Sequence, residues 1–261
     1  MNTLKLIKYQ LRDVLRSKWV FLYFLFFLVA TDALFRFGGD GERVILSMMN
    51  IILLIIPLVS IMLGTMYLYN AREYIELMLS QPVKRSQLFI ALFAALVLPM
   101  STAVLLGVGL PFVWQGAIFT HAGSVLFLIF MGISLTVIFS SIAFFIALMT
   151  EDRIRGLGLS IVLWLFFAVV YDGLILLFIY FYSHYPLQQP VLILSMLNPL
   201  DLGRIALLIR FDASALMGFT GAVFQNFFGS TRGLLIVFAV MLTWMATPLL
   251  LGFRRFVMRD F

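Results

Sequence analysis

Six long apolar runs dominate this sequence and leave it few possible folds. They occupy 19–37, 44–69, 88–113, 123–149, 157–182 and 234–253. A helix needs about 20 consecutive apolar residues to cross a hydrocarbon layer about 30 Å thick. Hydrophobic residues make up 63% of the chain and charged residues 11%, so the chain cannot cover itself with polar surface. We therefore predict an all-α integral membrane protein with six transmembrane helices, which form one membrane domain over residues 1–261.

The first eighteen residues have the pattern of a helix that lies in the membrane surface. Leu, Ile and Val residues share one helical face of 1–18, and basic residues share the other. No convincing small-residue cleavage site follows the first apolar run, so we expect an uncleaved first span rather than a signal peptide.

The positions of Lys and Arg predict the orientation of the spans. Basic residues that flank spans stay preferentially in the cytoplasm. If the amino terminus is inside, thirteen of the eighteen Lys and Arg residues lie on the cytoplasmic side. Both termini are therefore expected in the cytoplasm, with 70–88 on the same side and 183–233 outside. The net charge of +6 then serves orientation and contact with anionic lipid, and it requires no nucleic acid.

The outer connection, 183–233, is the longest segment that does not span. It contains apolar segments at 191–197 and 205–209 that are too short to cross, with the turn signal Asn198-Pro199 between them. We expect short helices that lie at or dip into the outer interface before the last span. Aromatic residues are expected to cap them, namely Phe219, Phe224, Phe227 and Phe228.

The cytoplasmic segment 70–88 carries the most informative pattern in the chain. Glu73 and Glu76 alternate with apolar residues, which predicts a short amphipathic helix, and Pro82 follows because proline cannot continue a helix. A rigid helix that projects from two spans is a good lever for a partner protein. An ordinary charged loop resting on lipid headgroups is the alternative, and the residues alone favour neither.

At this segment the chain resembles the ABC-2 family of ABC transporter permeases. Residues 76–86 read Glu-Leu-Met-Leu-Ser-Gln-Pro-Val-Lys-Arg-Ser, as such permeases typically do where they enter the third span. The resemblance implies that 70–88 is a coupling segment that contacts an ATPase. The residues it implies for this contact are Glu73, Tyr74, Glu76, Leu77, Met78, Pro82 and Arg85.

Two further segments, 164–172 and 197–205, resemble membrane subunits that serve the maturation of nitrous oxide reductase, a copper enzyme. This resemblance implies a homodimer in the bacterial inner membrane that binds two copies of a cytoplasmic ATPase, which hold ATP and Mg. It also implies a periplasmic copper-handling partner. Either cargo passes between the protomers, or the outer face transmits a conformational change. An ABC-2 exporter of another substrate is the nearest alternative.

The chain itself offers no nucleotide site or catalytic set. No Gly-x-x-x-x-Gly-Lys-Ser/Thr sequence occurs, so any ATP must be bound by another chain, and we expect a non-catalytic subunit without its own cofactor. A membrane enzyme would need a convergent catalytic pair that the sequence lacks. A self-contained secondary transporter or channel would need ionisable residues at the midplane, and Asp172 alone supports it.

Asp172 lies inside the fifth run, where an ionised carboxylate costs several kcal/mol unless it is paired or wetted. It is either a hinge or pathway residue, paired across a dimer with an arginine such as Arg204 or Arg36, or a structural hydrogen-bonding residue. Asp32 and Arg36 are spaced i, i+4 and predict a helical ion pair. The outer-side candidates that accompany Asp172 are Asn198, Pro199, Asp201 and Arg204.

Methionines form two pairs at helical spacing. Met62 with Met66, and Met241 with Met245, are each spaced i, i+4 and could present thioethers, which suit monovalent copper. Methionine is also a common filler of apolar packing, and no cysteine occurs in the chain, so packing is the preferred interpretation.

Overall fold

Six helices in the described part of the chain are long and apolar enough to cross a membrane, as predicted. The structure is a computed structural model that describes residues 10–11, 14, 17–184, 187–211 and 231–258. The helices begin or end at most five residues from the predicted bounds, because interfacial residues continue each helix past its apolar run. The spans are α2 (Lys18–Gly38), α3 (Gly41–Asn70), α5 (Arg85–Trp114), α6 (Ile118–Met149), the segment Arg153–Phe181 and α12 (Thr231–Met258).

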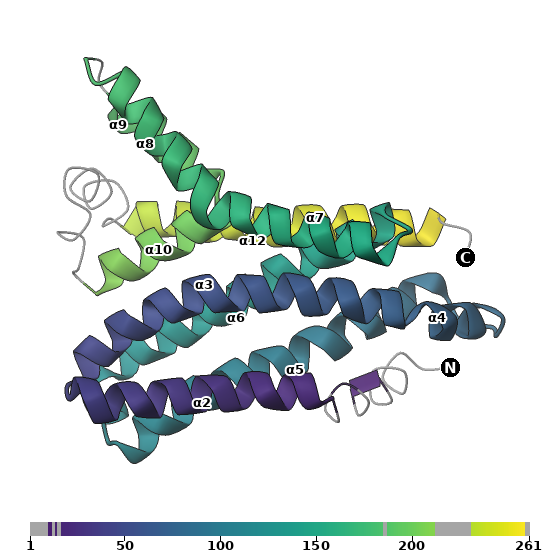
Figure 1. Cartoon of the computed structure of the whole chain (residues 1–261), viewed down its shortest axis with the longest axis horizontal. Helices are drawn as coiled ribbons and strands as arrows, with labels where there is room; N and C mark the ends of the chain where they lie inside the picture. Colours follow the sequence, from purple (N-terminus) through teal and green to yellow (C-terminus); the bar gives the residue numbers. More distant parts are fainter. Residues whose placement is uncertain (1–9, 12–13, 15–16, 185–186, 212–230, 259–261) are drawn as a thin grey trace.

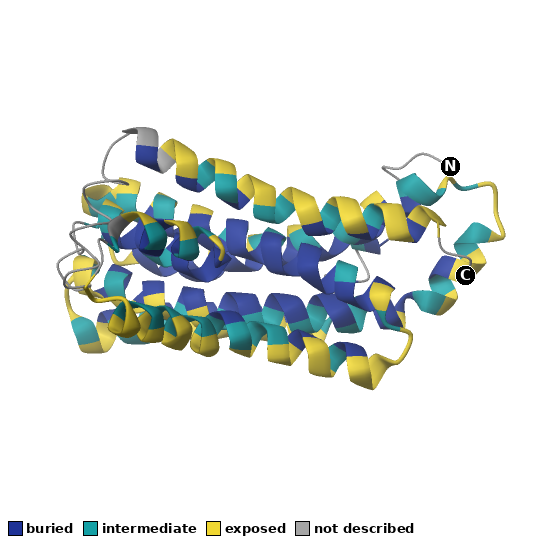
Figure 2. Cartoon of the chain, turned by 90° about the horizontal axis from the view of Figure 1, so that it is seen from above, coloured by how far each residue is buried: buried dark blue, intermediate teal, exposed yellow. Residues whose placement is uncertain are grey.

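Helix α6 lies at the centre of the bundle and contacts α3, α5 and α12, while α2 packs on the outside of α5 (Figure 1). Buried residues concentrate in α3, α5 and α6, as Figure 2 shows. Small residues let the backbones approach closely, which is how membrane helices gain packing contacts without a hydrophobic driving force. At Gly64, an added Cβ would lie only 2.7 Å from Ala143 Cβ on α6.

The fifth span consists of α7 (Arg153–Leu165), the π-helical turn η1 (Phe166–Val170) and α8 (Tyr171–Phe181). Asp152 caps α7, because its Oδ1 accepts from the Ile154 N–H at 2.8 Å. Only 6% of the apolar window of this span is buried inside the protomer, against 72% for α6. The fifth span is therefore attached to the bundle by few of its residues.

Two short helices, α9 (Gln188–Met196) and α10 (Pro199–Arg210), precede the last span and meet at a bend of 115°. Asn198 caps α10 by accepting from the Leu200 N–H at 3.0 Å, as the Asn-Pro signal suggests. The expected helices are present, but α10 is more deeply placed than an interfacial helix. Nine of its twelve residues are buried, because it packs against α3, α6 and α12.

Helix α2 begins and α12 ends at the end of the bundle that carries α4 (Arg72–Leu79), as an even number of spans requires (Figure 1). We call this the α4 end. Of the predicted surface helix at 1–18, Gln10, Leu11 and Val14 are helical, and most of the rest lies outside the described residues. The predicted aromatic cap at 219–228 also lies outside them.

Candidate functional site

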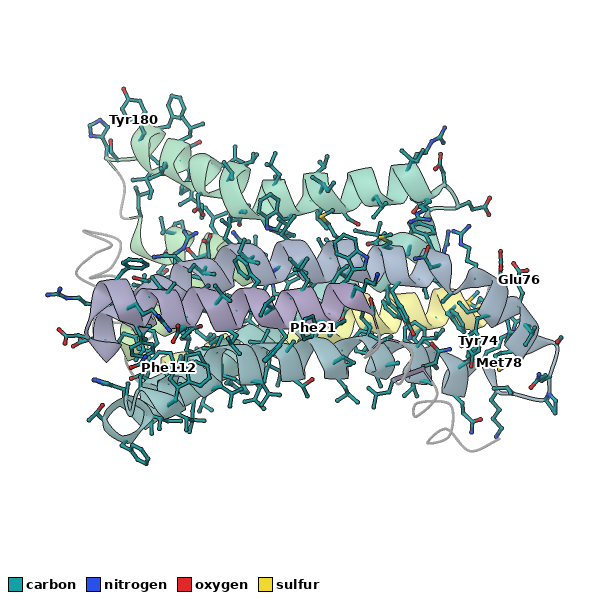
Figure 3. All side chains as sticks on the ribbon, turned by 60° about the horizontal axis from the view of Figure 1, so that its bottom comes forward. Phe21, Tyr74, Glu76, Met78, Phe112 and Tyr180 are labelled. Carbon is teal, nitrogen blue, oxygen red and sulfur yellow. The ribbon has the colours of Figure 1, made fainter. Side chains whose placement is uncertain are left out.

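Helix α4 is the predicted amphipathic helix, and it projects beyond the ends of the spans (Figures 1 and 3). Ile75 is 0% exposed and anchors the helix on the bundle, so the helix has one fixed face. The opposite face is solvent-exposed, and Leu77 on it is 57% exposed. Glu73, Glu76 and Ser80 complete this outward face at spacings of three and four residues.

The other predicted coupling residues do not all share that face. Pro82 is exposed in the turn after α4, whereas Tyr74 and Met78 are half-buried. The first residue of α5, Arg85, donates from Nη1 to the Val257 carbonyl at 2.9 Å and so ties the start of α5 to the end of α12. The segment therefore combines an exposed contact face with side chains that fix it to the spans.

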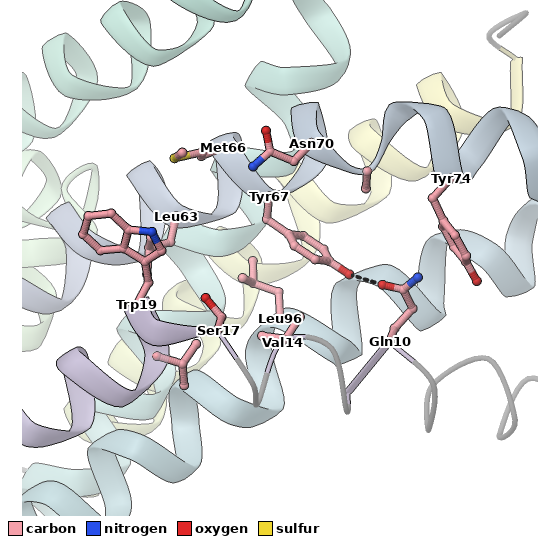
Figure 4. Close-up of a pocket in the computed structure, with 12 residues that line it drawn as sticks. Gln10, Val14, Ser17, Trp19, Leu63, Met66, Tyr67, Asn70, Tyr74 and Leu96 are labelled. Atoms are coloured by element: carbon pink, nitrogen blue, oxygen red, sulfur yellow. Dashed lines mark hydrogen bonds between the residues drawn. The ribbon is translucent and has the colours of Figure 1, made fainter.

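Tyr74 contributes to the wall of a cavity of about 310 Å³ at the α4 end, between the amino-terminal segment, α2, α3 and α5 (Figure 4). Tyr67 Oη donates to Gln10 Oε1 at 3.0 Å across one side of this cavity. Trp19, Met66 and Asn70 line it as well. Tyr74 thus contributes to the bundle more than to the outward face of α4.

A second set of predicted residues meets far from α4, at the junction of the fifth span with α10. Arg204 Nη1 lies 2.7 Å from Asp172 Oδ2 and 3.4 Å from Asp201 Oδ1. The expected partner of Asp172 is correct, but the pair forms within one chain rather than across a dimer. Arg36, the other suggested partner, instead pairs with Asp32 at 2.7 Å, as the i, i+4 spacing predicts.

Asp201 is the buried acid of this junction, and burial, together with the nearby Asp172 carboxylate, raises the pKa of Asp201. Two carboxylates face one guanidinium, and the Asp201 side chain is 8% exposed. Its Oδ2 has no hydrogen-bond partner among the described residues. A buried carboxylate oxygen without a donor is unfavourable. Asp201 is therefore the unfavourably placed residue of this cluster. Asp172 and Arg204 form the close ion pair.

Side chains that donate to backbone carbonyls hold α9 and α10 against the fifth span. Asn198, 0% exposed, donates from Nδ2 to the Phe167 carbonyl at 2.9 Å, and Tyr171 Oη donates to the Leu194 carbonyl at 2.6 Å. In η1 the Tyr171 N–H bonds to the Phe166 carbonyl, five residues back. The carbonyl that accepts from the Asn198 amide, that of Phe167, lies within this π-helical turn. We call these contacts, with Asp172–Arg204, the α10 junction.

The predicted methionine pairs lie in packed surroundings. Met62, Met66 and Met245 are half-buried, and Met241 is 2% exposed within the apolar core. Within the described ranges, no three His, Asp or Glu side chains gather in a metal-binding arrangement. Packing stays the preferred interpretation of these pairs, and copper binding by their thioethers stays the untested alternative.

Residues 34–261 match the sequence profile of ABC-2 family transporter proteins. This chain belongs to that family. The permease is also similar to a probable ABC transporter permease protein, NosY, of Pseudomonas aeruginosa, with 26% identity over 228 residues that cover 80% of this chain and 82% of the relative. Family and relative together indicate a membrane permease subunit, a class that is generally non-catalytic.

Sequence reasoning missed one group in this permease, at the start of α7. Tyr69 and Arg72 on the α4 side both reach Thr150, and Tyr69 packs directly on Gly156. The turn Thr150-Glu151-Asp152 marks the start of the fifth span in the sequence. Nothing in the sequence pairs that turn with Tyr69, since the two are eighty-one residues apart.

Proposed function

We propose that this permease is the membrane subunit of an ABC transporter and that α4 is the helix through which a separate cytoplasmic ATPase acts on it. The main support for this proposal is the exposed outward face of α4. Glu73, Glu76 and Leu77 lie exposed on a short helix whose opposite side is fixed by the fully buried Ile75. A partner that grips this face moves α3 and α5 together, because α4 is joined to both by short connections.

The complete transporter in this proposal contains two copies of the permease and two ATPases, which hold ATP and Mg. The nearly unburied fifth span supports a second copy. Within α7, its exposed residues Ile154, Ile161, Val162 and Leu165 stand at positions i, i+7, i+8 and i+11 and form one stripe. A second protomer that packs along this stripe covers it, with both termini and the ATPases on the cytoplasmic side.

On the periplasmic side, the proposed role is copper-site maturation of nitrous oxide reductase through a copper-handling partner. The likeness to NosY supports it, together with the resemblance of 164–172 and 197–205 to such subunits. The centre of the protomer is filled by apolar side chains of α3, α5 and α6. This packing favours a signal passed through α10 over an ion passed through one protomer. Export of another substrate between two protomers is the alternative.

Co-purification tests the proposal. A tagged permease, extracted from its own bacterium in mild detergent, should retain an ATPase and lose it when Glu76 is replaced by Lys. Glu42→Lys is the matched control, because Glu42 is also exposed but lies at the opposite end of α3 from α4. Purification of an active permease without any ATPase would overturn the proposal in favour of a secondary transporter.

A further inference from the structure

The fifth span touches the rest of the protomer along one narrow row. Of its described residues in α7, η1 and α8, only Gly156, Ser160 and Phe167 are buried. The first two lie one turn apart on α7 and face α3, which is the main neighbour of α7. Apolar packing therefore contributes little to holding α7, and the contacts of this row must position it.

At the α4 end, the row begins with Tyr69 of α3. Its hydroxyl donates to the Thr150 carbonyl at 3.1 Å and also bonds to Thr150 Oγ1. Arg72, the first residue of α4, donates from Nη2 to the same carbonyl at 3.1 Å. The Arg72 guanidinium also lies 4.6 Å from the centre of the Tyr69 ring, as a cation–π contact. The root of α4 and the turn before α7 thus share one set of bonds.

Gly156 makes this contact sterically possible. A Cβ at this position would lie 2.0 Å from Tyr69 Oη, 2.7 Å from Tyr69 Cζ and 2.8 Å from Thr150 Oγ1. No real Cβ approaches other atoms this closely, so any larger residue must displace the tyrosine or move α7 away from α3. Gly158 differs sharply, because a Cβ added there meets nothing within 4 Å.

Two further contacts continue the row toward the middle of the bundle. Thr65 Oγ1 and Ser160 Oγ are 2.8 Å apart and both buried. Trp164 Nε1 donates to the Leu54 carbonyl at 3.2 Å. The contacts therefore repeat every four residues along α7. Beyond them come the π-helical turn and the α10 junction.

We infer that this row transmits displacement of α4 to the fifth span, with Tyr69, Gly156 and Ser160 as its positioning residues. The inference rests on the proposed function for the source of the motion. Because Arg72 and Tyr69 both hold Thr150, α4, the end of α3 and the start of α7 move as one unit. Beyond the row, the span contacts the bundle mainly through Phe167, which packs against Phe139 and Trp244, and through the α10 junction. Its motion is therefore passed on to α10 through this junction.

The first test needs no ATPase. The chain contains no cysteine, so spin labels can be attached to cysteines introduced at Asn50 on α3 and Leu176 on α8, both exposed. Electron–electron resonance is measured on the full chain in lipid nanodiscs, with labelled protein diluted into unlabelled protein to isolate distances within one protomer. Gly156→Ala should shift or broaden the distance distribution, and Gly158→Ala should leave it unchanged. An unchanged distribution in Gly156→Ala overturns the inference.

A second variant set guards against failure of Gly156→Ala to fold. Tyr69→Phe and Ser160→Ala remove hydroxyl contacts of the row without adding volume. Both should broaden the same distribution, and the double variant should broaden it further. A double variant that keeps the wild-type distribution shows that the polar contacts do not position α7.

The final measurement separates this inference from the proposed function. In the complex with its ATPase, ATP should change distances measured from a label on α4 and from a label on α8 in the wild type. In Gly156→Ala, ATP should still change the distance measured from the α4 label but no longer change the distance measured from the α8 label. An α8 change that persists in this variant overturns the inference. If ATP moves neither label in the wild type, the proposed function fails, and the measurement without ATPase still decides the role of the row.

Discussion

Replacing Asn198 by Ala should loosen α10 from the fifth span. The change removes the cap at the Leu200 N–H and leaves the Phe167 carbonyl without its amide donor, at a position that is 0% exposed. Loss of an N-cap costs about 1 kcal/mol, and a buried carbonyl left unsatisfied costs about 1–3 kcal/mol. The free energy of detaching α10 should fall by about 2–4 kcal/mol if the two costs add. Since a factor of ten corresponds to about 1.4 kcal/mol, the detached population rises at least about 30-fold.

Hydrogen exchange of α10 amides, measured by mass spectrometry on the full chain in nanodiscs, reports this population directly. Asn198→Ser should show an intermediate effect, because the serine hydroxyl keeps a neutral capping oxygen for the Leu200 N–H while the amide donor to the Phe167 carbonyl is lost. Asn50→Ala is the control, since the Asn50 amide makes only a 3.4 Å exposed contact with Leu46 in its own helix. Unchanged exchange of α10 in Asn198→Ala would refute the reasoning, because the two bonds would then contribute nothing to its placement.

Three further substitutions have defined outcomes. Asp201→Asn should leave the melting temperature in detergent unchanged or raise it, because Asp201 Oδ2 has no donor among the described residues and the change removes a second carboxylate beside one guanidinium. A clear fall in the melting temperature would mean that the Asp201 carboxylate has a stabilising partner. Arg36→Gln should change the free energy of unfolding by less than about 1 kcal/mol, because the Arg36 side chain is 73% exposed and solvent screens its pair with Asp32. A larger loss would mean that the pair is shielded from water. Tyr171→Phe should raise hydrogen exchange in α9 by less than Asn198→Ala raises it in α10, because it removes one bond, to the Leu194 carbonyl, rather than two bonds at the start of α10. An equal or larger increase would make Tyr171 the main contact between these helices and the fifth span.

Much of the architecture follows from the sequence because the bilayer restricts the choices. A hydrocarbon layer accepts backbone only when its polar groups bond within the segment, so each long apolar run must become a helix. The same local logic predicted the helix at α4, the break at Asn198-Pro199 and the Asp32–Arg36 pair, since each depends on residues within four positions of one another.

The fifth span shows where this reasoning ends. Its hydropathy resembles that of α6, yet 6% of its apolar window is buried against 72% in α6. In a membrane, a side chain that faces lipid and one that faces protein are both apolar, so periodicity does not separate the two surfaces. The sequence therefore predicts that 157–182 spans, but not that most of its surface lies uncovered beside the bundle.

The sequence by itself determined the number of spans, their order and the short helix between the second and third, because these depend on local composition and bilayer thickness. Only the tertiary structure decided that Asp172 pairs with Arg204 of its own chain, that α10 enters the bundle, and that Gly156 lies against Tyr69. These partners lie far apart in the chain and meet through small residues and single polar groups. Such contacts have no periodic pattern, since their geometry is set by how already formed helices pack.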